Sequence, residues 1–230
     1  GSTAAEVKVD RRGRGPLCRA AVTNTGATPV RLKEIVLFEG AHGYPPETRI
    51  YGEGFTMLSQ TGGTLAKAED IGGYTDRKHY RIPEPADAVT VYNFACLTRA
   101  DGRQELLGFE SSRRWAGRVH LRAAALQVTV DCERLELGPG ETWRMEEFCR
   151  LEGQDVYEQF ARRIAAHHPQ LPWPAPPEGW CSWYCFGPRV TARQVMDNLD
   201  WIAKNAPYLR YIQIDDGYQP AMGDWLETGS

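Results

Sequence analysis

The sequence predicts an α+β multidomain fold, in which an N-terminal β-sandwich (supersandwich) precedes the first βαβ unit of a truncated (β/α)8 TIM barrel. Three observations lead to it: short alternating segments at the beginning, a proline-rich stretch, and a strand–helix–strand pattern at the end. We place the sandwich in residues 1–152, a helix and proline-rich linker in 153–177, and the start of the (β/α)8 barrel, as a first strand, a helix and a second strand, in 178–230.

The N-terminal region consists of short segments typical of half-buried antiparallel strands. "RLKEIVLF", "VTVYNFACL" and "LQVTVDCERLEL" are rich in β-branched or aromatic residues and partly alternate apolar with polar positions. Turn signals such as "NTGATP", "RADGRQ" and "LGPGETW" separate these segments. Many short strands with such turns predict a sandwich. Residues 40–85 are rich in glycine and less regular, and we predict long loops there.

The pattern changes after this region to a helix followed by a stiff connector. Val156, Phe160 and Ile164 recur every four residues in "DVYEQFARRIAAHH", which predicts an amphipathic helix that begins near Asp155. Five prolines follow in "HPQLPWPAPPEG". Proline fixes φ and removes a backbone donor, so neither a helix nor a central strand is compatible with this stretch.

The last segments read as two buried strands with a helix between them. "GWCSWYCF" and "YLRYIQIDD" are continuous apolar or aromatic runs of strand length, as expected for a parallel sheet. Between them, Thr191 and Gln194 form a capping box at the start of a helix. The predicted apolar face of that helix consists of Val195, Leu199, Ile202 and Ala206. Two strands and one helix cannot bury their own faces, so either another chain supplies the missing strands or this is the first quarter of a barrel that has been cut. We favour the cut barrel.

The composition excludes several classes of function. The formal net charge is -3 and there is no basic stripe, so nucleic acid is not an expected partner. No apolar stretch approaches the length needed to span a bilayer, so no membrane partner is expected either. The six cysteines are scattered without a CxxC pair, which favours reduced thiols and a cytoplasmic location, without excluding secretion.

Two adjacent carboxylates stand where a barrel places ligand-binding groups. Asp215 and Asp216 are predicted to end the second strand, and Trp183 and Tyr184 to end the first. In such barrels the carboxyl ends of the strands line the active-site mouth. All four side chains are therefore candidates for binding a ligand.

The aspartate pair has several alternative interpretations. It could cap a helix or lie in a solvated turn. An acid–base pair is disfavoured, because neighbours on a strand point to opposite faces whereas a glycosidase needs two carboxyls facing one bond. A metal site is disfavoured because no third ligand follows at a suggestive spacing. If the chain bends at Gly217, both carboxylates could instead accept hydrogen bonds from adjacent hydroxyls of one sugar.

The last fifty residues resemble a known family of enzymes. "GWCSWY", followed by "QIDDGYQ" and "GDWL", is similar to the opening of the catalytic barrel of glycoside hydrolase family 36 α-galactosidases, which are related to melibiases and to plant raffinose synthases. The β-rich region and the proline linker resemble that family by arrangement more than by motif.

The resemblance implies a galactose pocket without its reacting groups. It implies that Asp215 and Asp216 hold the axial 4-hydroxyl and the 6-hydroxyl of a terminal α-galactose, with Trp183 or Tyr184 lining the same subsite. Trp225 is a further candidate, with barrel packing as the alternative. In the family, the nucleophile and the acid/base lie on later barrel strands, so the resemblance implies no catalytic residue in this chain. It also implies neither a metal nor another cofactor.

A residue of the sandwich is a further candidate for the wall of the pocket. In the family, a loop of the sandwich can reach towards the active site, and by position "ETRIYGEGFTMLSQ", with Tyr51, is the candidate loop. The alternative is that Tyr51 is an ordinary loop or core aromatic residue.

Three functions remain open at this point. The first is a retaining hydrolase that removes terminal α-linked galactose, with galactose-containing oligosaccharides as its substrates. The second is a galactosyltransferase of the raffinose-synthase type. The third is a non-catalytic carbohydrate-binding or interaction fragment. The resemblance also allows a homo-oligomer.

Overall fold

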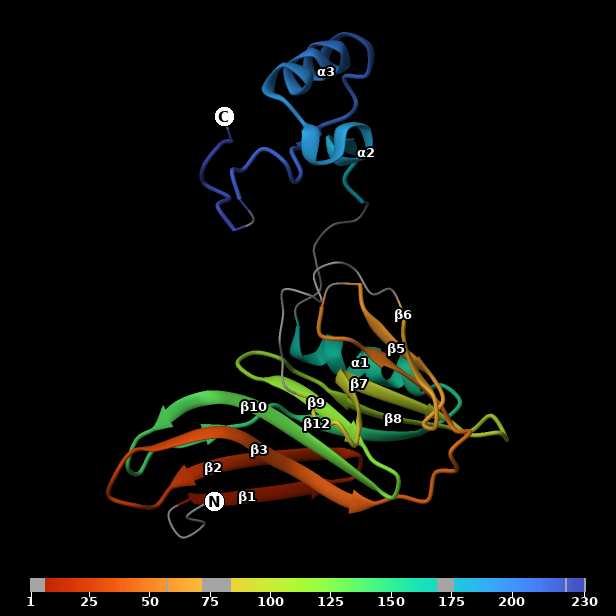
Figure 1. The fold of residues 1–230 in the computed structure, drawn as a ribbon, viewed down its shortest axis with the longest axis vertical. Coiled ribbons are helices and arrows are strands. Elements are labelled where there is room, and N and C mark those ends of the chain that lie inside the picture. The colour runs from red at the N-terminus through yellow and green to blue at the C-terminus, as the bar shows by residue number, and fades with distance from the viewer. Residues whose placement is uncertain (1–6, 57, 72–83, 169–175, 222, 230) are drawn as a thin grey trace. The chain divides into compact units, whose positions relative to one another are not determined.

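The computed structural model describes residues 7–56, 58–71, 84–168, 176–221 and 223–229. The chain divides into two compact units, 1–170 and 171–230 (Figure 1). Most of the predicted proline-rich linker lies outside the described residues. Within the described part of the chain, no helix combines the length and the apolar character needed to cross a membrane.

The first unit is built from antiparallel strands, as predicted. Every pair of neighbouring strands in it runs antiparallel. The strands are β1 (Val7–Arg14), β2 (Leu17–Asn24), β3 (Val30–Ala41), β4 (Arg49–Glu53), β5 (Gln60–Gly63), β6 (Ala68–Ile71), β7 (Val89–Thr98), β8 (Gln104–Phe109), β9 (Ala116–Leu121), β10 (Ala125–Leu137), β11 (Thr142–Arg144) and β12 (Phe148–Gly153).

Strand β7 connects two parts of this sheet. Its first half pairs with β9 and its second half with β8, and β4 pairs along its other edge. Asn93 lies between the two halves with a φ of 59°, a left-handed conformation that few non-glycine residues adopt. Its side-chain amide donates to Glu53 Oε2 of β4 at 2.6 Å. The change of partner therefore coincides with a local irregularity in the strand.

The resulting sheet is nearly barrel-like. The strands follow the order β3-β10-β9-β7-β8-β12-β2-β1. The two ends of this path approach each other, since the guanidinium of Arg11 in β1 donates to the Val36 carbonyl of β3 at 2.6 Å. The predicted sandwich thus takes the form of one hydrogen-bonded sheet that curves back on itself.

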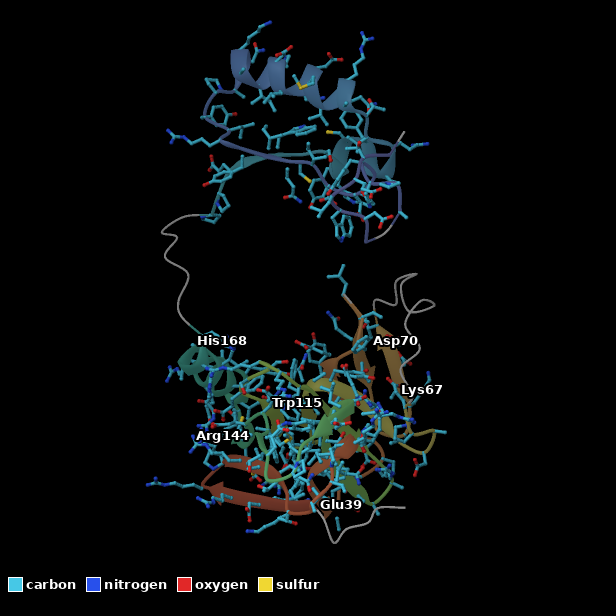
Figure 2. All side chains as sticks on the ribbon, turned by 90° about the vertical axis from the view of Figure 1, so that its left-hand side faces the viewer. Glu39, Lys67, Asp70, Trp115, Arg144 and His168 are labelled. Carbon is cyan, nitrogen blue, oxygen red and sulfur yellow. The ribbon has the colours of Figure 1, made fainter. Side chains whose placement is uncertain are left out.

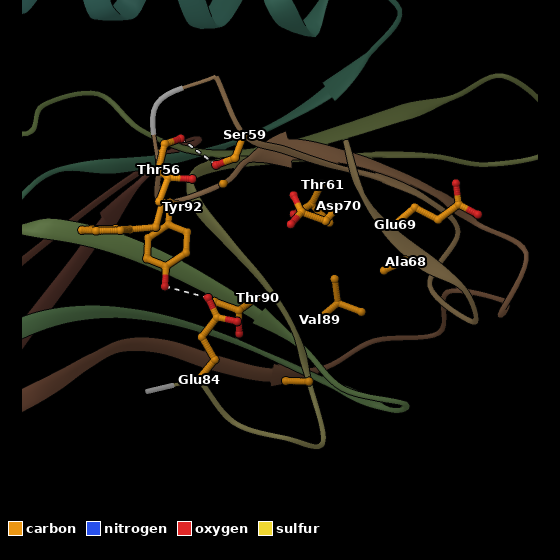
Figure 3. Close-up of a pocket in the computed structure, with 13 residues that line it drawn as sticks. Thr56, Ser59, Thr61, Ala68, Glu69, Asp70, Glu84, Val89, Thr90 and Tyr92 are labelled. Atoms are coloured by element: carbon orange, nitrogen blue, oxygen red, sulfur yellow. Dashed lines mark hydrogen bonds between the residues drawn. The ribbon is translucent and has the colours of Figure 1, made fainter. Parts of the chain in front are cut away.

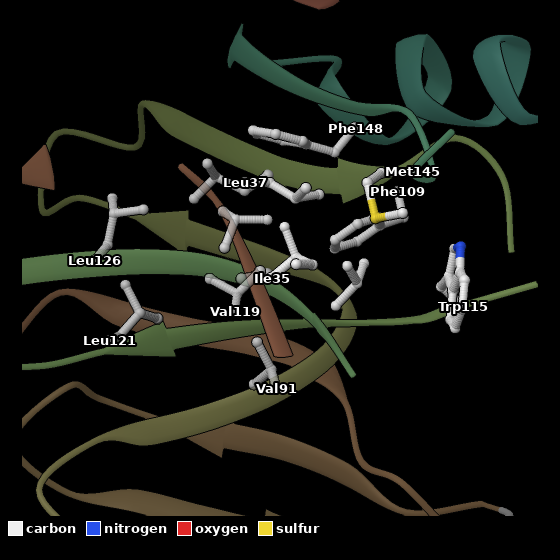
Figure 4. Close-up of a cluster of buried hydrophobic side chains, with 14 of the residues drawn as sticks. Ile35, Leu37, Val91, Phe109, Trp115, Val119, Leu121, Leu126, Met145 and Phe148 are labelled. Atoms are coloured by element: carbon white, nitrogen blue, oxygen red, sulfur yellow. The ribbon is translucent and has the colours of Figure 1, made fainter. Parts of the chain in front are cut away.

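The core of the first unit lies inside this curved sheet. Val22, Val91, Val119 and Val128 come from four different strands and are completely buried. Figure 4 shows Val91 and Val119 within this cluster of apolar side chains. Burying a side chain of this size stabilises the fold by about 1.5–3 kcal/mol relative to leaving it exposed. Trp115 lies inside the unit, among the crowded side chains of Figure 2.

The predicted helix is present and packs on the sheet. Helix α1 (Val156–His167) buries Val156 and Phe160 against residues of β8 and β12. Gly108 of β8 allows this approach, because a Cβ atom there would lie 2.4 Å from the Phe160 ring. The helix is therefore part of the first unit.

The prediction of long loops in residues 40–85 is wrong for much of its described part. That region contains β4, β5 and β6, which pair with one another in sequence and join the sheet through β7. Tyr51 is on β4, and not on a loop. Glycines at positions 52, 62 and 63 hid these strands, because glycine is depleted in strands generally.

The second unit contains a βαβ arrangement. Strand β13 (Gly179–Cys181) pairs in parallel with β14 (Tyr211–Gln213), and helix α3 (Ala192–Asn205) lies between them in sequence. The predicted capping box is present at the start of α3. Val195 and Ile202 are buried, whereas Leu199 of the predicted face is 38% exposed.

The prediction that Trp183 and Tyr184 end the first strand is wrong. The strand stops at Cys181, and the chain turns into the short helix α2 (Trp183–Phe186) and then the 3-10 helix η2 (Gly187–Arg189). The amide of Phe186 donates to the Ser182 carbonyl at 2.9 Å, which closes a helical turn. A short apolar run does not distinguish a strand from a helix by its period alone.

Candidate functional site

The candidate site is formed by the two segments that leave the carboxyl ends of β13 and β14. These strands are parallel, so their ends lie at the same edge of the small sheet. In open or closed α/β sheets, ligands bind beyond this edge. Asp215 and Asp216 follow β14, and α2 with Trp183 and Tyr184 follows β13.

Ser182 connects the two segments. It is completely buried, and its amide donates to the Gln213 carbonyl at 3.0 Å, continuing the strand pairing. Its hydroxyl oxygen accepts from the amide of Asp215 at 2.9 Å. The backbone of Asp215 is therefore fixed relative to the first turn of α2.

The side chain of Asp215 accepts several hydrogen bonds within the site. Oδ1 accepts from the Asp216 amide at 2.8 Å. Oδ2 accepts from the Gln213 side-chain amide at 2.8 Å and faces the Cys181 thiol at 3.5 Å. The bond from the Asp216 amide is the largest influence, and with the other two it lowers the pKa of Asp215 below its ordinary value. Asp215 is therefore ionised at neutral pH.

The side chain of Asp216 has one described partner. The Gln219 side-chain amide donates to Asp216 Oδ1 at 3.2 Å, and Gln219 Oε1 accepts from the Gly217 amide at 2.9 Å. Gly217 has a φ of 109°, and a Cβ atom there would lie 2.6 Å from the backbone of Pro188. Glycine is thus required at the turn that directs the chain away after the two aspartates.

These contacts distinguish the two carboxylates as acceptors. A carboxylate offers about four acceptor positions. Three donors hydrogen-bond to the carboxylate of Asp215. Gln219 is the one donor to the carboxylate of Asp216 among the residues that the structure describes. Asp216 therefore retains more capacity to accept hydrogen bonds from a ligand.

The predicted aromatic residues differ in their surroundings. Trp183 is 42% exposed and Tyr184 is 89% exposed, so both rings are accessible to a ligand. Trp225 is 46% exposed, and its carbonyl accepts from the Tyr218 hydroxyl at 2.9 Å, which ties its segment to the loop after Asp216. These three residues share the second unit with the aspartates. Tyr51 belongs to the first unit, where its ring packs at 6.0 Å from that of Phe94.

The first unit contains a pocket of its own, with a volume of about 390 Å³ (Figure 3). The rings of Phe55 and Tyr92 pack at 5.3 Å on its wall, and the Tyr92 hydroxyl donates to Glu84 at 2.8 Å. Glu69 also lines it. Aromatic rings beside carboxylates and hydroxyls are a combination suited to a polar ligand with one apolar face.

A cluster of charged residues lies where α1 meets the sheet. Glu110, Glu147 and His167 bring potential metal-ligand atoms within 4.8 Å of one another. Arg163 pairs with Glu110, and Arg19 pairs with Glu147 at 2.7 Å. Because each carboxylate already has a guanidinium partner, we interpret the cluster as an ion-pair network that fastens the end of α1.

Comparisons with solved structures relate this fold to known enzymes. An α-galactosidase from Thermus thermophilus, in complex with p-nitrophenyl α-D-galactopyranoside, aligns with a TM-score of 0.51 and 19% identity over 95% of this chain and 43% of that chain. AgaA, a GH36 α-galactosidase from Geobacillus stearothermophilus, aligns with a TM-score of 0.57 and 12% identity over 98% of this chain and 34% of that chain. The galactosidase domain of an α-galactosidase–sucrose kinase, AgaSK, aligns with a TM-score of 0.55 and 13% identity over 97% and 34%.

The chain shares its fold with part of a GH36 α-galactosidase. The resemblance expected from the sequence is thereby confirmed at the level of the fold. No family model matches the chain. The chain spans 34–43% of the length of these α-galactosidases.

The sequence analysis did not identify the residues that hydrogen-bond to the two aspartates in the second unit. Ser182 and Gln219 both lie in the motifs that carry the resemblance, but their roles depend on which segments meet in space. The available signal was the polar character of Gln219, two residues after a glycine turn, where a side chain can reach back to its own loop.

Proposed function

We propose that the protein containing this chain is a retaining glycoside hydrolase that removes terminal α-linked galactose from oligosaccharides or glycoconjugates. In this proposal the chain supplies part of the galactose pocket. The observation that carries it is the pair Asp215–Asp216 at the carboxyl edge of β13 and β14, in a chain with the fold of an α-galactosidase segment.

The ligands of the similar structures support a galactose-containing substrate. Those proteins were solved with p-nitrophenyl α-galactopyranoside, with stachyose and with raffinose. An ionised carboxylate is a strong acceptor for a sugar hydroxyl. In our proposal, Asp215 and Asp216 each accept from a galactose hydroxyl, and Trp183 or Tyr184 contacts the apolar face of the sugar ring.

We assign neither aspartate a role as nucleophile or acid. Asp215 is held by three donors and its pKa is lowered, which suits a fixed acceptor more than a group that must donate a proton. We propose that the βαβ unit begins a (β/α)8 barrel and that later strands supply the reacting groups. Trp225 and Tyr51 remain proposed wall residues.

The direct test is hydrolysis of p-nitrophenyl α-galactoside by the full-length protein. Asp216→Asn should raise KM strongly, because an amide is a weaker acceptor than a carboxylate. Asp200→Asn, an exposed position on α3, is the matched control and should leave KM unchanged. Absence of both hydrolysis and galactose binding in the unmodified protein would contradict the proposal.

A binding function is the second candidate, and the pocket between β5, β6 and β7 is the observation that favours it. A protein that binds galactosides without cleaving them, and loses this binding on Phe55→Ala, would support this alternative. Transfer of galactose to sucrose in the same assay would identify a transferase of the raffinose-synthase type.

A further inference from the structure

Gln219 stands between the turn at Gly217 and the carboxylate of Asp216. Its Oε1 accepts from the Gly217 amide at 2.9 Å and its Nε2 donates to Asp216 Oδ1 at 3.2 Å. The side chain thus forms a bridge from the backbone of the loop to one oxygen of the carboxylate. Both ends of an amide side chain are used, which fixes its orientation.

The bridge holds an otherwise weakly restrained side chain. Asp215 is restrained through its amide by Ser182 and through its carboxylate by Gln213. The backbone amide of Asp216 donates to Asp215 Oδ1, but among the described residues its carboxylate accepts a hydrogen bond from Gln219 alone. A side chain with free rotamers loses conformational entropy when a ligand orders it. A restraint present before binding reduces that loss.

We propose that Gln219 is a positioning residue that sets the rotamer of Asp216 for a galactose hydroxyl; this inference rests on the proposed function. The amide occupies Oδ1, and no donor to Oδ2 is present among the described residues, so Oδ2 can accept from a ligand hydroxyl. Gln219 touches no reacting atom, so it acts through Asp216 on binding and not on the chemical step.

The test compares Gln219→Glu with the unmodified full-length protein. The substituted side chain still accepts from the Gly217 amide, but it presents a negative charge to Asp216 in place of a donor. We expect KM for p-nitrophenyl α-galactoside, and Kd for galactose, to rise about tenfold or more at pH 7.5, the typical effect of losing a hydrogen bond to a charged group. We expect kcat to change little, because a binding contact made equally in the ground and transition states affects KM alone.

The pH dependence separates positioning from a merely structural role. The neighbouring charge of Asp216 raises the pKa of the introduced carboxyl above its ordinary value of about 4.3. Towards pH 5 this carboxyl gains a proton and can again donate to Asp216. The affinity lost at pH 7.5 should then be partly recovered relative to the unmodified protein, whereas Gln219→Met should stay defective at both pH values.

Gln159→Glu provides the matched control, because Gln159 donates to Asp155 at 2.8 Å on α1 in a similar glutamine–aspartate pair. It should leave KM unchanged. A Gln219→Glu protein with unchanged KM, or with a lowered melting temperature and no recovery of affinity at low pH, would overturn the inference alone. An unmodified protein that neither binds galactose nor cleaves the galactoside would overturn the proposed function and this inference together.

Discussion

Arg118 of β9 and Asp131 of β10 form an ion pair in which the two side chains are only 8% and 9% exposed. Lys33 Nζ approaches the same carboxylate at 2.7 Å. Burial by itself would raise the pKa of Asp131, but the Lys33 hydrogen bond, the Glu133 amide and the Arg118 charge outweigh it and hold the pKa below its ordinary value. The buried carboxylate of Asp131 thus pairs with two cations, which come from β3 and β9, the strands on either side of β10.

Removing one cation from this pair should destabilise the first unit. We expect Arg118→Met to lower the free energy of unfolding by about 3 kcal/mol, because it leaves a buried carboxylate with less compensation. Chemical denaturation followed by tryptophan fluorescence measures the loss. Arg122→Met is the control: Arg122 pairs with Asp87, whose side chain is 71% exposed, and such pairs contribute about 1 kcal/mol or less. Equal losses in the two variants would contradict this interpretation.

Buried His120 should make stability depend on pH below neutrality. Burial, followed by the charges of Arg118 and Arg122, lowers the pKa of His120 in the folded protein. The unfolded chain, with a histidine pKa of about 6.5, then binds more protons than the folded chain, so stability falls as the pH drops below that value. The loss continues until the pH reaches the folded pKa.

The contribution of His120 can be isolated by substitution. We expect the unfolding free energy of His120→Gln to change less between pH 7 and pH 5 than that of the unmodified protein, by up to about 1.4 kcal/mol per pH unit. His168→Gln, at an exposed position, should keep the original slope. If His120→Gln retains the slope as well, another group is responsible.

The contact between Gly108 and Phe160 should be sensitive to one added methyl group. Gly108→Ala would place a Cβ atom 2.4 Å from the ring, and we expect it to lower stability by about 1–3 kcal/mol. Phe160→Leu in the same protein should recover part of this loss, so the two changes are not additive. Gly13→Ala, where the nearest atom to a Cβ lies 4.0 Å away, is the control. Additive effects in the double variant would show that the contact is not the cause.

The two aspartates should respond differently to the same substitution. Asp215→Asn removes a carboxylate that three donors share, so we expect both a lower melting temperature and weaker galactose binding. Asp216→Asn, with Gln219 as its described partner, should weaken binding with a smaller change in melting temperature. Calorimetry and galactose titration on the full-length proteins measure the two effects. The opposite ranking of melting temperatures would contradict the assignment of partners.

Local patterns in the sequence predicted the elements that local interactions determine. The helix with Val156 and Phe160 on one face is present, and so is the capping box of Thr191 and Gln194. In each of these two signals, the residues involved lie within four positions of one another, where side-chain spacing decides the structure. The antiparallel strands of the first unit were predictable for the same reason, because alternating apolar and polar positions and short turn sequences are local patterns.

Non-local relationships were not predictable in this way. The short helix at Trp183 begins where Ser182 hydrogen-bonds to the end of β14 and to the residues that follow it. A short apolar run in the sequence does not indicate that contact. The pairing of β4, β5 and β6 was hidden by their glycines. For the candidate site, the position of the aspartates after the second strand was predictable, but the contacts of Asp215 with Ser182 and Cys181 were not, because these residues lie 33 and 34 positions away in the sequence.

The shared strand β7 has a consequence for how the first unit loses its structure. Strand β7 hydrogen-bonds to β4, β8 and β9. The part of the curved sheet that contains β8 therefore cannot separate from the part that contains β9 without breaking hydrogen bonds of β7. Partial opening at β7 exposes both sides to solvent at once, which favours a single cooperative transition over stepwise melting. Its pairings also join segments far apart in sequence, from Arg49 to Leu121, so this strand is expected to be completed late and slowly during folding.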